Sequence, residues 1–348
     1  MKIAVYAIAL NEEQFVQTWF DSAKEADVLL IADTGSTDNT VAVARSLGIT
    51  VHHIGIRPWR FDDARNASLA LLPLDVDYCI ALDLDEVLSP NWRAELEKAH
   101  AAGWTRPRYS YTWNWNEDGT PGLVYGGDKI HTRTGYRWKH PVHEVCRRYD
   151  QTPETQGWVG LEIHHHADNT KPRSQYLPLL SMSVQEDPHD DRNAFYYARE
   201  LFFYGRTDEA AVEFQRHLNL PSAVWAPERA TSMRYLHKIT GDVTWLHRAI
   251  EQAPGRREAL VELAQHHHNQ REWQACYDAA LAALAMTERP LEYLCENFAW
   301  GHTPHDLAAL AAYHLGLPEQ ARAHGARALE FAPDDPRLRT NLDFYLAA

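Results

Sequence analysis

The sequence is poor in cysteine and lacks the cysteine patterns that mark disulfide-rich or thiolate zinc proteins. Its 348 residues contain four cysteines, at positions 79, 146, 276 and 295, with no C-x-x-C pair among them. A disulfide framework needs patterned cysteines, and a thiolate zinc site needs them in close pairs. The composition therefore predicts a protein with reduced thiols, as expected in the cytoplasm.

Long hydrophobic runs and an excess of positive charge are also missing. No apolar stretch approaches the roughly 18 residues that a transmembrane helix requires, and the opening MKIAVYAIALNEE has only a short apolar run, unlike a secretory signal. The formal net charge is −14, which argues against bulk affinity for nucleic acid or anionic membranes. We expect a folded cytoplasmic protein of one or two domains without a transmembrane segment.

Strand-like and helix-like segments alternate through the first 90 residues. Short apolar runs predict strands at residues 2–10, 28–32, 49–54 and 78–82. Helical periodicity predicts helices between them, at residues 12–26, from residue 36 or 38 to 47, and at 62–72. Strands that alternate with helices indicate βαβ units, so the fold class of this half is α/β with a mostly parallel sheet.

Acidic side chains follow two of these predicted strands. Asp33 opens the segment DTGSTD after residues 28–32, and Asp83, Asp85 and Glu86 follow residues 78–82. Ligands of open α/β sheets bind beyond the carboxyl ends of the strands, so both acidic groups are expected in one crevice. Two carboxylates one residue apart are hard oxygen ligands for Mg²⁺ or Mn²⁺, which commonly join a carboxylate to substrate phosphates. This pattern is typical of a nucleotide-diphosphate site.

Five sequence blocks together resemble glycosyltransferase family 2, whose members have a nucleotide-sugar-binding GT-A fold. In chain order the blocks are AIALNEE (7–13), ADTGSTDNT (32–40), FDDARNASL (61–69), ALDLDE (81–86) and WKHPVHE (138–144). The last block is similar to one in bacterial members related to lipopolysaccharide-core and peptide glycosyltransferases. The resemblance covers about the first half of the chain, and the order of the blocks makes it specific.

The resemblance implies a UDP-sugar site with a divalent ion. Contacts with the nucleotide sugar are implied for Ala9, Asn11, Glu13, Asp33, Gly35, Arg65, Asp83 and Leu84. Mn²⁺ or Mg²⁺ ligands are implied at Asp85, Asp83, His143 and His166. For Asp33 the bland alternative is a turn cap before Gly35, and Asp38 has the same alternative as a helix cap.

An inverting transfer needs a base that takes the proton of the acceptor. Glu144, in the VHE block, lies where the related enzymes place their base, and Asp128 is the rival. The alternative for Glu144 is a structural hydrogen bond with His143. The alternative for Asp128 is an ion pair with Lys129 or Arg133 beside a glycine turn.

Histidine and aromatic clusters allow both structural and functional interpretations. His164, His165 and His166 follow a predicted strand at residues 159–163, and strand alternation points the first and third to one side and His165 to the other. Tyr109, Tyr111, Trp113 and Trp115 alternate with polar residues and form one face, which either packs in the core or stacks on sugars or bases. The triplet at 266–268 lies in a helical region and is expected to be solvated.

Positive charge gathers between residues 101 and 148. This segment contains eight Lys and Arg against four Asp and Glu, in an otherwise acidic chain. One interpretation is neutralisation of the diphosphate, and the other is an anionic acceptor, such as a phosphorylated glycan, a lipid phosphate or nucleic acid.

From about residue 193 the periodicity becomes helical, with small residues recurring at Ala198, Ala230, Ala264 and Ala309. The first spacings are near 34 residues, which resembles tetratricopeptide-type repeats. The last spacing carries extra residues around 287–303. Polar, proline-punctuated stretches near 168–173 and 186–191 separate the halves, so we predict a GT-A glycosyltransferase domain at 1–175 and an all-α helical-repeat domain at 176–348.

We therefore expect a metal-dependent, inverting, UDP-sugar-using glycosyltransferase. Its acceptor would be a glycan, a polypeptide or a modified base of phage DNA, and the helical repeats would contact protein or form an oligomer. One alternative is a nucleotidyltransferase, but AIALNEE lacks the glycine-rich basic loop of that class. Another is a non-catalytic scaffold that binds nucleotide only as a regulator.

Overall fold

The computed structural model describes residues 1–168 and 176–347 and contains two compact units. The first comprises Met1–Ser183 and the second Val184–Ala348. The sequence predicts a boundary after residue 175, but Tyr176–Ser183, the first part of helix α5 (Tyr176–Glu186), belongs to the first unit. The predicted linker at 168–173 lies almost entirely outside the described residues.

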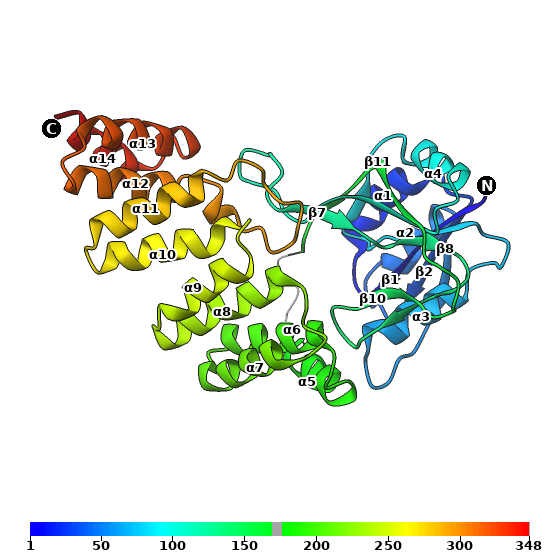
Figure 1. The fold of residues 1–348 in the computed structure, drawn as a ribbon. Helices are drawn as coiled ribbons and strands as arrows, with labels where there is room; N and C mark the ends of the chain where they lie inside the picture. The colour runs from blue at the N-terminus through cyan, green and yellow to red at the C-terminus, as the bar shows by residue number, and fades with distance from the viewer. Residues whose placement is uncertain (169–175, 348) are drawn as a thin grey trace. The chain divides into compact units, whose positions relative to one another are not determined.

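A five-stranded sheet forms the centre of the first unit (Figure 1). Its order is β3 (Thr50–His53), β2 (Val28–Asp33), β1 (Ile3–Ala9), β4 (Tyr78–Ala81) and β8 (Ile130–Thr132). The first four strands are parallel, and β8 pairs antiparallel with β4. The mostly parallel sheet expected from the alternating pattern is confirmed.

Helices cover both faces of this sheet because its strands are apolar on both sides. On one face α1 (Glu13–Ala23) buries Trp19, whose indole N–H donates to the carbonyl of Leu82 at 3.0 Å. On the other face α3 (Phe61–Ala70) packs Leu69 against residues such as Tyr6 and Trp138. Helices α2 (Thr40–Ser46) and α4 (Trp92–Ala101) complete the layers. Helix α2 begins after Asn39, and the side chain of Asp38, one of the two expected caps, accepts from the amide of Thr40 in its first turn at 2.9 Å.

A second, four-stranded sheet has the order β5 (Glu86–Leu88), β11 (Gln156–His165), β6 (Arg106–Thr112) and β7 (Val124–Gly127). Strand β6 ends three residues earlier than the aromatic alternation suggests. Tyr109 and Tyr111 are buried in the core, whereas Trp113 is 39% exposed. The aromatic face is therefore divided between core and surface.

A two-stranded ribbon, β9 (Tyr136–Lys139) with β10 (Val145–Arg148), packs against α3. The side chain of Asn66 donates to the carbonyl of Trp138 and accepts from its amide, both at 2.9 Å. The loop that joins the two strands contains His143 and Glu144. The ribbon therefore places the loop with the VHE block beside the amino end of α3, where the amide of Phe61 donates to the carbonyl of Pro141.

The second unit consists of antiparallel helix pairs, stacked one after another in Figure 1. The pairs are α6 (Asp191–Phe203) with α7 (Thr207–Asn219), α8 (Ala226–Thr240) with α9 (Thr244–Gln252), α10 (Arg257–Asn269) with α11 (Trp273–Leu284), and α12 (Thr303–His314) with α13 (Pro318–Phe331), followed by α14 (Pro336–Ala347). Each recurring alanine of the sequence lies on the first helix of a pair and is buried. The prediction of a helical second half is confirmed.

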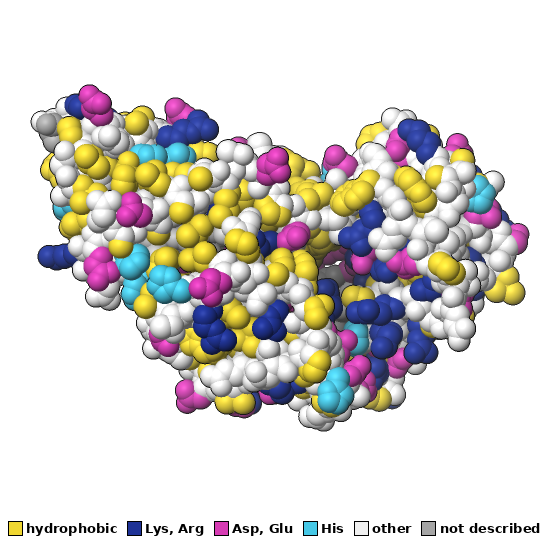
Figure 2. Space-filling model, viewed as in Figure 1, with side chains coloured by type: hydrophobic (Ala, Val, Ile, Leu, Met, Phe, Trp, Pro, Cys, Tyr) yellow, Lys and Arg dark blue, Asp and Glu magenta, His cyan; other side chains and the backbone are white. Residues whose placement is uncertain are grey.

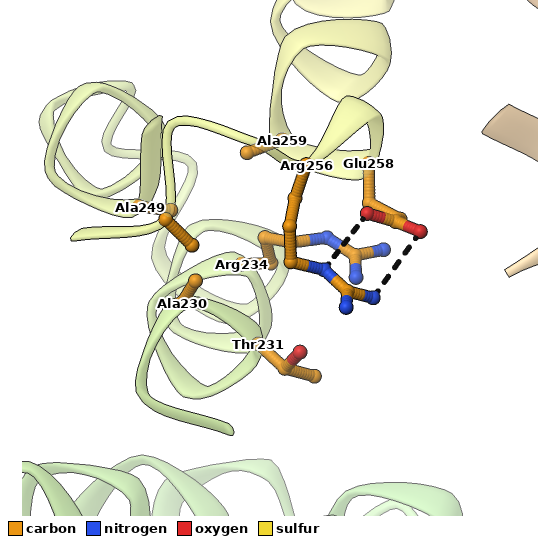
Figure 3. Close-up of a pocket in the computed structure, with 8 residues that line it drawn as sticks. Ala230, Thr231, Arg234, Ala249, Arg256, Glu258 and Ala259 are labelled. Atoms are coloured by element: carbon orange, nitrogen blue, oxygen red, sulfur yellow. Dashed lines mark hydrogen bonds and ion pairs between the residues drawn. The ribbon is translucent and has the colours of Figure 1, made fainter. Parts of the chain in front are cut away.

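Buried arginines hold the segment between α11 and α12, which contains the extra residues of the repeat pattern. Arg234 donates to Glu296 at 2.7 Å, and Arg257 donates to the carbonyl of Met286 at 2.9 Å. Figure 3 shows Arg234 and Arg256 beside a small cavity between α8, α9 and α10, with Arg256 paired to Glu258. Arg234 and Arg257 thus bind residues that are distant in the sequence, so the extra segment is packed into the unit.

Within residues 1–168 and 176–347, the helices are too short or too polar to cross a membrane.

Candidate active site at the carboxyl edge of the sheet

A tight turn carries the paired aspartates out of β4. The amide of Glu86 donates to the carbonyl of Asp83 at 2.9 Å, and the amide of Asp83 donates to the Glu86 carboxylate at 2.9 Å. Leu84, between the aspartates, is buried in the core. The turn is thus closed by its own acidic residue, which fixes the backbone of Asp83 and Asp85.

Two cations hold the Asp83 carboxylate. Arg65, on α3, donates to both of its oxygens at 2.8 and 3.0 Å, and the Lys129 ammonium donates to Oδ2 at 2.8 Å. Burial alone would raise the pKa of Asp83, but the charges of Arg65 and Lys129 outweigh burial and hold it well below its usual range. Asp83 is therefore a carboxylate at every physiological pH.

Lys129 also binds Glu86, at 2.7 Å, and the hydroxyl of Tyr111 donates to the same carboxylate at 2.6 Å. Burial raises the pKa of Glu86, and the neighbouring Asp83 raises it further while Lys129 opposes both. Glu86 is 1% exposed, so it acts as an internal support for the turn.

Arg65 links this turn to the ribbon. Its Nε donates to Glu144 at 2.5 Å, across 79 positions of sequence, and its guanidinium lies 4.9 Å from the centre of the Trp138 ring. The result is a continuous chain of charges, Glu86–Lys129–Asp83–Arg65–Glu144, in which three carboxylates face two cations. The cluster keeps a residual negative charge.

Asp85 lies beside the histidines at the end of β11. Its carboxylate is 3.4 Å from Nε2 of His165, and its carbonyl accepts from the amide of His166 at 2.7 Å. The ring of His166 stacks on Trp115, with centroids 5.7 Å apart. The structure therefore gives Asp85 the ring of His165 as its partner, whereas the sequence favours His166.

His143 lies in the ribbon loop next to Glu144, in a left-handed backbone conformation (φ 50°), with its ring 5.8 Å from that of Tyr176. Among the described residues of the first unit, no group of three metal-ligating side chains has all its ligand atoms within 4.8 Å. Of the ligands that the resemblance implies, Asp85 thus has an imidazole beside it, but this imidazole belongs to His165 and not to His143 or His166.

Asp128 is not part of the charge chain, because it pairs with Arg106 instead. Its carboxylate accepts from Arg106 at 3.0 Å, and its backbone carbonyl accepts from the same guanidinium at 3.2 Å. Asp128 and Lys129 are consecutive, so their side chains leave the backbone in different directions. The pairing expected with Lys129 or Arg133 is replaced by the pairing with Arg106.

The loops after β1 and β2 are joined to each other. The Asn11 side-chain oxygen accepts from the amide of Thr37 at 2.7 Å, and the Glu13 carboxylate accepts from the amide of Asn39 at 2.7 Å. In the opposite direction, Asp38 accepts from the amide of Glu13 at 3.2 Å. Ala9, the last residue of β1, accepts from the amide of Thr34 through its carbonyl at 2.9 Å.

Asp33 is fully buried and caps its own turn. It accepts from the amides of Gly35 and Ser36 at 3.1 and 3.2 Å, and from Nδ1 of His53 at 3.0 Å. Gly35 needs its glycine because its φ is 117°. Strand β1 lies between β2 and β4, so Asp33 and Asp83 occupy the same edge of the sheet one strand apart.

Three residues of this site are missed by reasoning from the sequence: Lys129, His165 and Tyr111, the partners of Asp83, Asp85 and Glu86. In the sequence Lys129 stands out only as one of the eight Lys and Arg residues between positions 101 and 148. Strand alternation assigns His165 to the opposite side, and Tyr111 is one member of a face of aromatic residues.

Part of this chain is similar to a known protein family. The family model for glycosyl transferase family 2 matches residues 5–150. The match covers about two fifths of the chain. The matched segment includes every candidate residue described above except the histidines of β11, which follow it within the same compact unit.

Curated relatives share only part of this chain. An uncharacterized glycosyltransferase of Rickettsia bellii (strain RML369-C) is 32% identical over 102 residues, which are 29% of this chain and 33% of that protein. The lipopolysaccharide core biosynthesis glycosyltransferase LpsC of Rhizobium meliloti (strain 1021) is 29% identical over 119 residues, which are 32% of this chain and 43% of LpsC. The chain thus spans less than half the length of these relatives.

Two solved structures are similar to parts of this chain. Glucosyl-3-phosphoglycerate synthase from Mycobacterium tuberculosis, in complex with Mn²⁺, UDP and phosphoglyceric acid, is 26% identical over 32% of this chain and 44% of its own, with a TM-score of 0.29. A thermophilic TPR protein of Thermus thermophilus is 18% identical over 49% of this chain and 89% of its own, with a TM-score of 0.34.

The charge chain predicts a pH-dependent loss of stability. Replacing Asp83→Asn leaves Arg65 and Lys129 without their shared carboxylate, so the free energy of unfolding at pH 7 should fall by about 3 kcal/mol. Because the folded pKa of Asp83 lies below the unfolded value of about 3.9, this contribution is complete above about pH 5. It is lost as the pH falls below the unfolded pKa.

Urea unfolding of the wild type and Asp83→Asn between pH 7 and pH 3 measures this difference. Asp75→Asn, which breaks an exposed surface pair with Lys2, is the control and should leave the free energy of unfolding nearly unchanged. A difference between wild type and Asp83→Asn that stays constant down to pH 3 would contradict the depressed pKa.

Proposed function

We propose that the first unit is a metal-dependent, inverting glycosyltransferase that transfers a sugar from a UDP-sugar to an acceptor nucleophile. One observation carries this proposal: within the segment that matches family 2, Arg65 ties the paired-aspartate turn to Glu144, 79 positions away in sequence. A metal-binding group and a base are the two chemical functions that such a transfer requires. The proposed metal-binding turn and the proposed base contact the same side chain, that of Arg65.

The donor set at Asp85 fits a divalent ion. A carboxylate oxygen and an imidazole nitrogen 3.4 Å apart are ligands that Mn²⁺ accepts, and the diphosphate of the donor supplies further oxygens. Asp85 and His165 would hold the ion, with Asp83 beside them. When bound, Mn²⁺ or Mg²⁺ stabilises the negative charge of the departing UDP.

Glu144 is proposed to take the acceptor proton. The acceptor oxygen forms a bond to the anomeric carbon, the bond from that carbon to the diphosphate oxygen breaks, and UDP leaves with the electron pair. The proton of the acceptor passes to Glu144, and attack from the face opposite UDP inverts the anomeric centre. The ion pair with Arg65 engages Oε1 and positions the carboxylate for this role.

The ribbon favours an anionic acceptor. Arg137 and Arg147 stand directly opposite each other in the β9–β10 register, an arrangement of like charges that is destabilising by itself. With Lys139, they have no hydrogen bond or ion pair among the described residues. Figure 2 shows Lys and Arg side chains gathered over β10. An acceptor carrying phosphate would relieve this repulsion next to the loop that holds Glu144.

The other positive charges of the 101–148 segment are satisfied within the protein. Arg106 pairs with Asp128, Lys129 with Asp83, and Arg148 with Asp150, while Arg108 and Arg133 donate to backbone carbonyls. The charges left for an acceptor are therefore those of the ribbon, which narrows the proposal to one surface.

The metal assignment predicts that Asp85→Asn abolishes transfer and leaves the fold intact, because the change removes a ligand charge from a partly exposed side chain. Mn²⁺-dependent affinity for UDP should fall about 10- to 100-fold. Calorimetric titration of UDP with and without Mn²⁺ measures this, and Asp75→Asn should behave as the wild type. Unchanged Mn²⁺-dependent affinity in Asp85→Asn would remove the basis of the assignment.

The base assignment predicts that Glu144→Gln lowers turnover by about 10²- to 10⁴-fold and retains UDP binding. Asp128→Asn, which loses the pairing with Arg106, is the matched control and should retain most activity. The linkage in the product, read from its NMR coupling constants, should be β from an α-linked donor. An α linkage, or an inactive Asp128→Asn beside an active Glu144→Gln, would reverse the assignment.

The acceptor assignment predicts that the double variant Arg137→Ser, Arg147→Ser raises KM for an anionic acceptor by about tenfold or more and leaves hydrolysis of the UDP-sugar unchanged. A lipopolysaccharide-core oligosaccharide, tested with and without its phosphates, is the probe. Arg45→Ser, on the exposed side of α2, is the control. Equal use of both oligosaccharides by the wild type would refute an anionic acceptor while leaving the transferase intact.

A further inference from the structure

The first three helices of the second unit bring their ends together. Helices α6, α7 and α8 are successive neighbours, and α6 also contacts α8. Because α7 runs antiparallel to both, its carboxyl end lies with the amino ends of α6 and α8. Asp191, His217 and Glu228 come from these three ends, and their ligand atoms all lie within 4.8 Å of one another.

Two of these side chains are buried to an extent unusual for their type. His217 is 0% exposed and Glu228 is 3% exposed. An acidic residue in the first turn of a helix is common, since it complements the helix dipole. Burial of such a carboxylate against a second one is costly unless cations compensate for it. Burial raises the pKa of Glu228 and the Asp191 charge adds to this rise, while the Tyr293 hydroxyl and the charges of Arg192 and Arg199 oppose it only in part.

The imidazole of His217 is prepared as a ligand. Its Nδ1 is 2.9 Å from the hydroxyl of Ser232, and its buried Nε2 has no hydrogen-bond partner among the described residues. A hydrogen bond at one ring nitrogen fixes the tautomer and leaves the lone pair of the other for a metal. Burial, with the nearby Arg229 and Arg216, lowers the pKa of His217 to about 4, so the ring is neutral at physiological pH.

Glu228 is held in place from a different part of the unit. The hydroxyl of Tyr293, in the segment between α11 and α12, donates to its Oε1. Asp191, by contrast, has no hydrogen bond or ion pair within the described ranges. One oriented carboxylate, a second carboxylate without a partner in those ranges, and one imidazole nitrogen therefore lie within 4.8 Å of one another.

We propose that Asp191, His217 and Glu228 form a zinc site that joins α6, α7 and α8. One imidazole and two carboxylates are ligands that Zn²⁺ takes at about 2.0–2.2 Å, with water in the fourth position. Tetrahedral bonds of this length place ligand atoms about 3.4 Å apart, so closure from 4.8 Å requires only small side-chain rotations. The site stabilises the start of the helical unit and shares no residue with the donor site of the first unit.

Zinc binding to the full-length chain tests this proposal. The Asp85→Asn background removes the proposed donor-site ligand, and the protein is stripped of metal before use. With ZnCl₂ about a hundredfold above its Kd, the Tm of the helical unit should rise by about 5–10 °C. Metal analysis after gel filtration should show one more Zn²⁺ per chain than in the site variants.

Asp191→Asn and His217→Gln, made in the same background, should lose both the bound Zn²⁺ and the rise in Tm. Asp208→Asn is the matched control, because Asp208 occupies the first turn of α7 and lies outside the group. If His217→Gln fails to fold, Asp191→Asn decides alone, since Asp191 is partly exposed. The proposal is overturned if Zn²⁺ leaves the Tm of the Asp85→Asn protein unchanged, or if the rise persists in Asp191→Asn.

Discussion

The first unit depends on one buried guanidinium. Arg65 is 6% exposed, donates twice to Asp83 and once to Glu144, and lies against the Trp138 ring. Removing a cation from water is costly, and only charges placed with correct geometry offset that cost. Because α3 fixes Arg65 on the sheet, the turn after β4 and the ribbon loop must both come to it.

The surroundings of Arg65 contain two groups of opposite charge, an acidic one around Asp83 and a basic one on the ribbon. The inner cluster around Asp83 has more carboxylates than cations, which suits a divalent ion. The outer face of the ribbon has Arg137 and Arg147 without partners in the described structure, which suits an anion. Trp138, which follows Arg137 in β9, is on the side of the inner cluster, with its ring against Arg65 and its indole N–H donating to the Tyr6 hydroxyl at 2.9 Å.

Features that depend on a local pattern can be predicted from the sequence alone. Strands such as β1, the turn at Asp83, and the buried alanines of the helix pairs all follow from periodicity and turn chemistry. The partners of the turn depend on strand register instead. Lys129 reaches Asp83 because β8 adds antiparallel to β4, and His165 reaches Asp85 because it pairs with Glu86 across β11 and β5. No local pattern encodes such registers, which are set by packing of the whole sheet.

The hydrogen bonds between the loops after β1 and β2 constrain how the sequence of this domain can evolve. Asn11 holds the amide of Thr37 while in a left-handed conformation (φ 54°), and Glu13 and Asp38 each hold the other's loop. A substitution in one loop therefore leaves a donor or acceptor unsatisfied in the other. Substitutions in the two loops are therefore expected to covary among related proteins. This holds even though about 25 residues and a helix separate the loops in the chain.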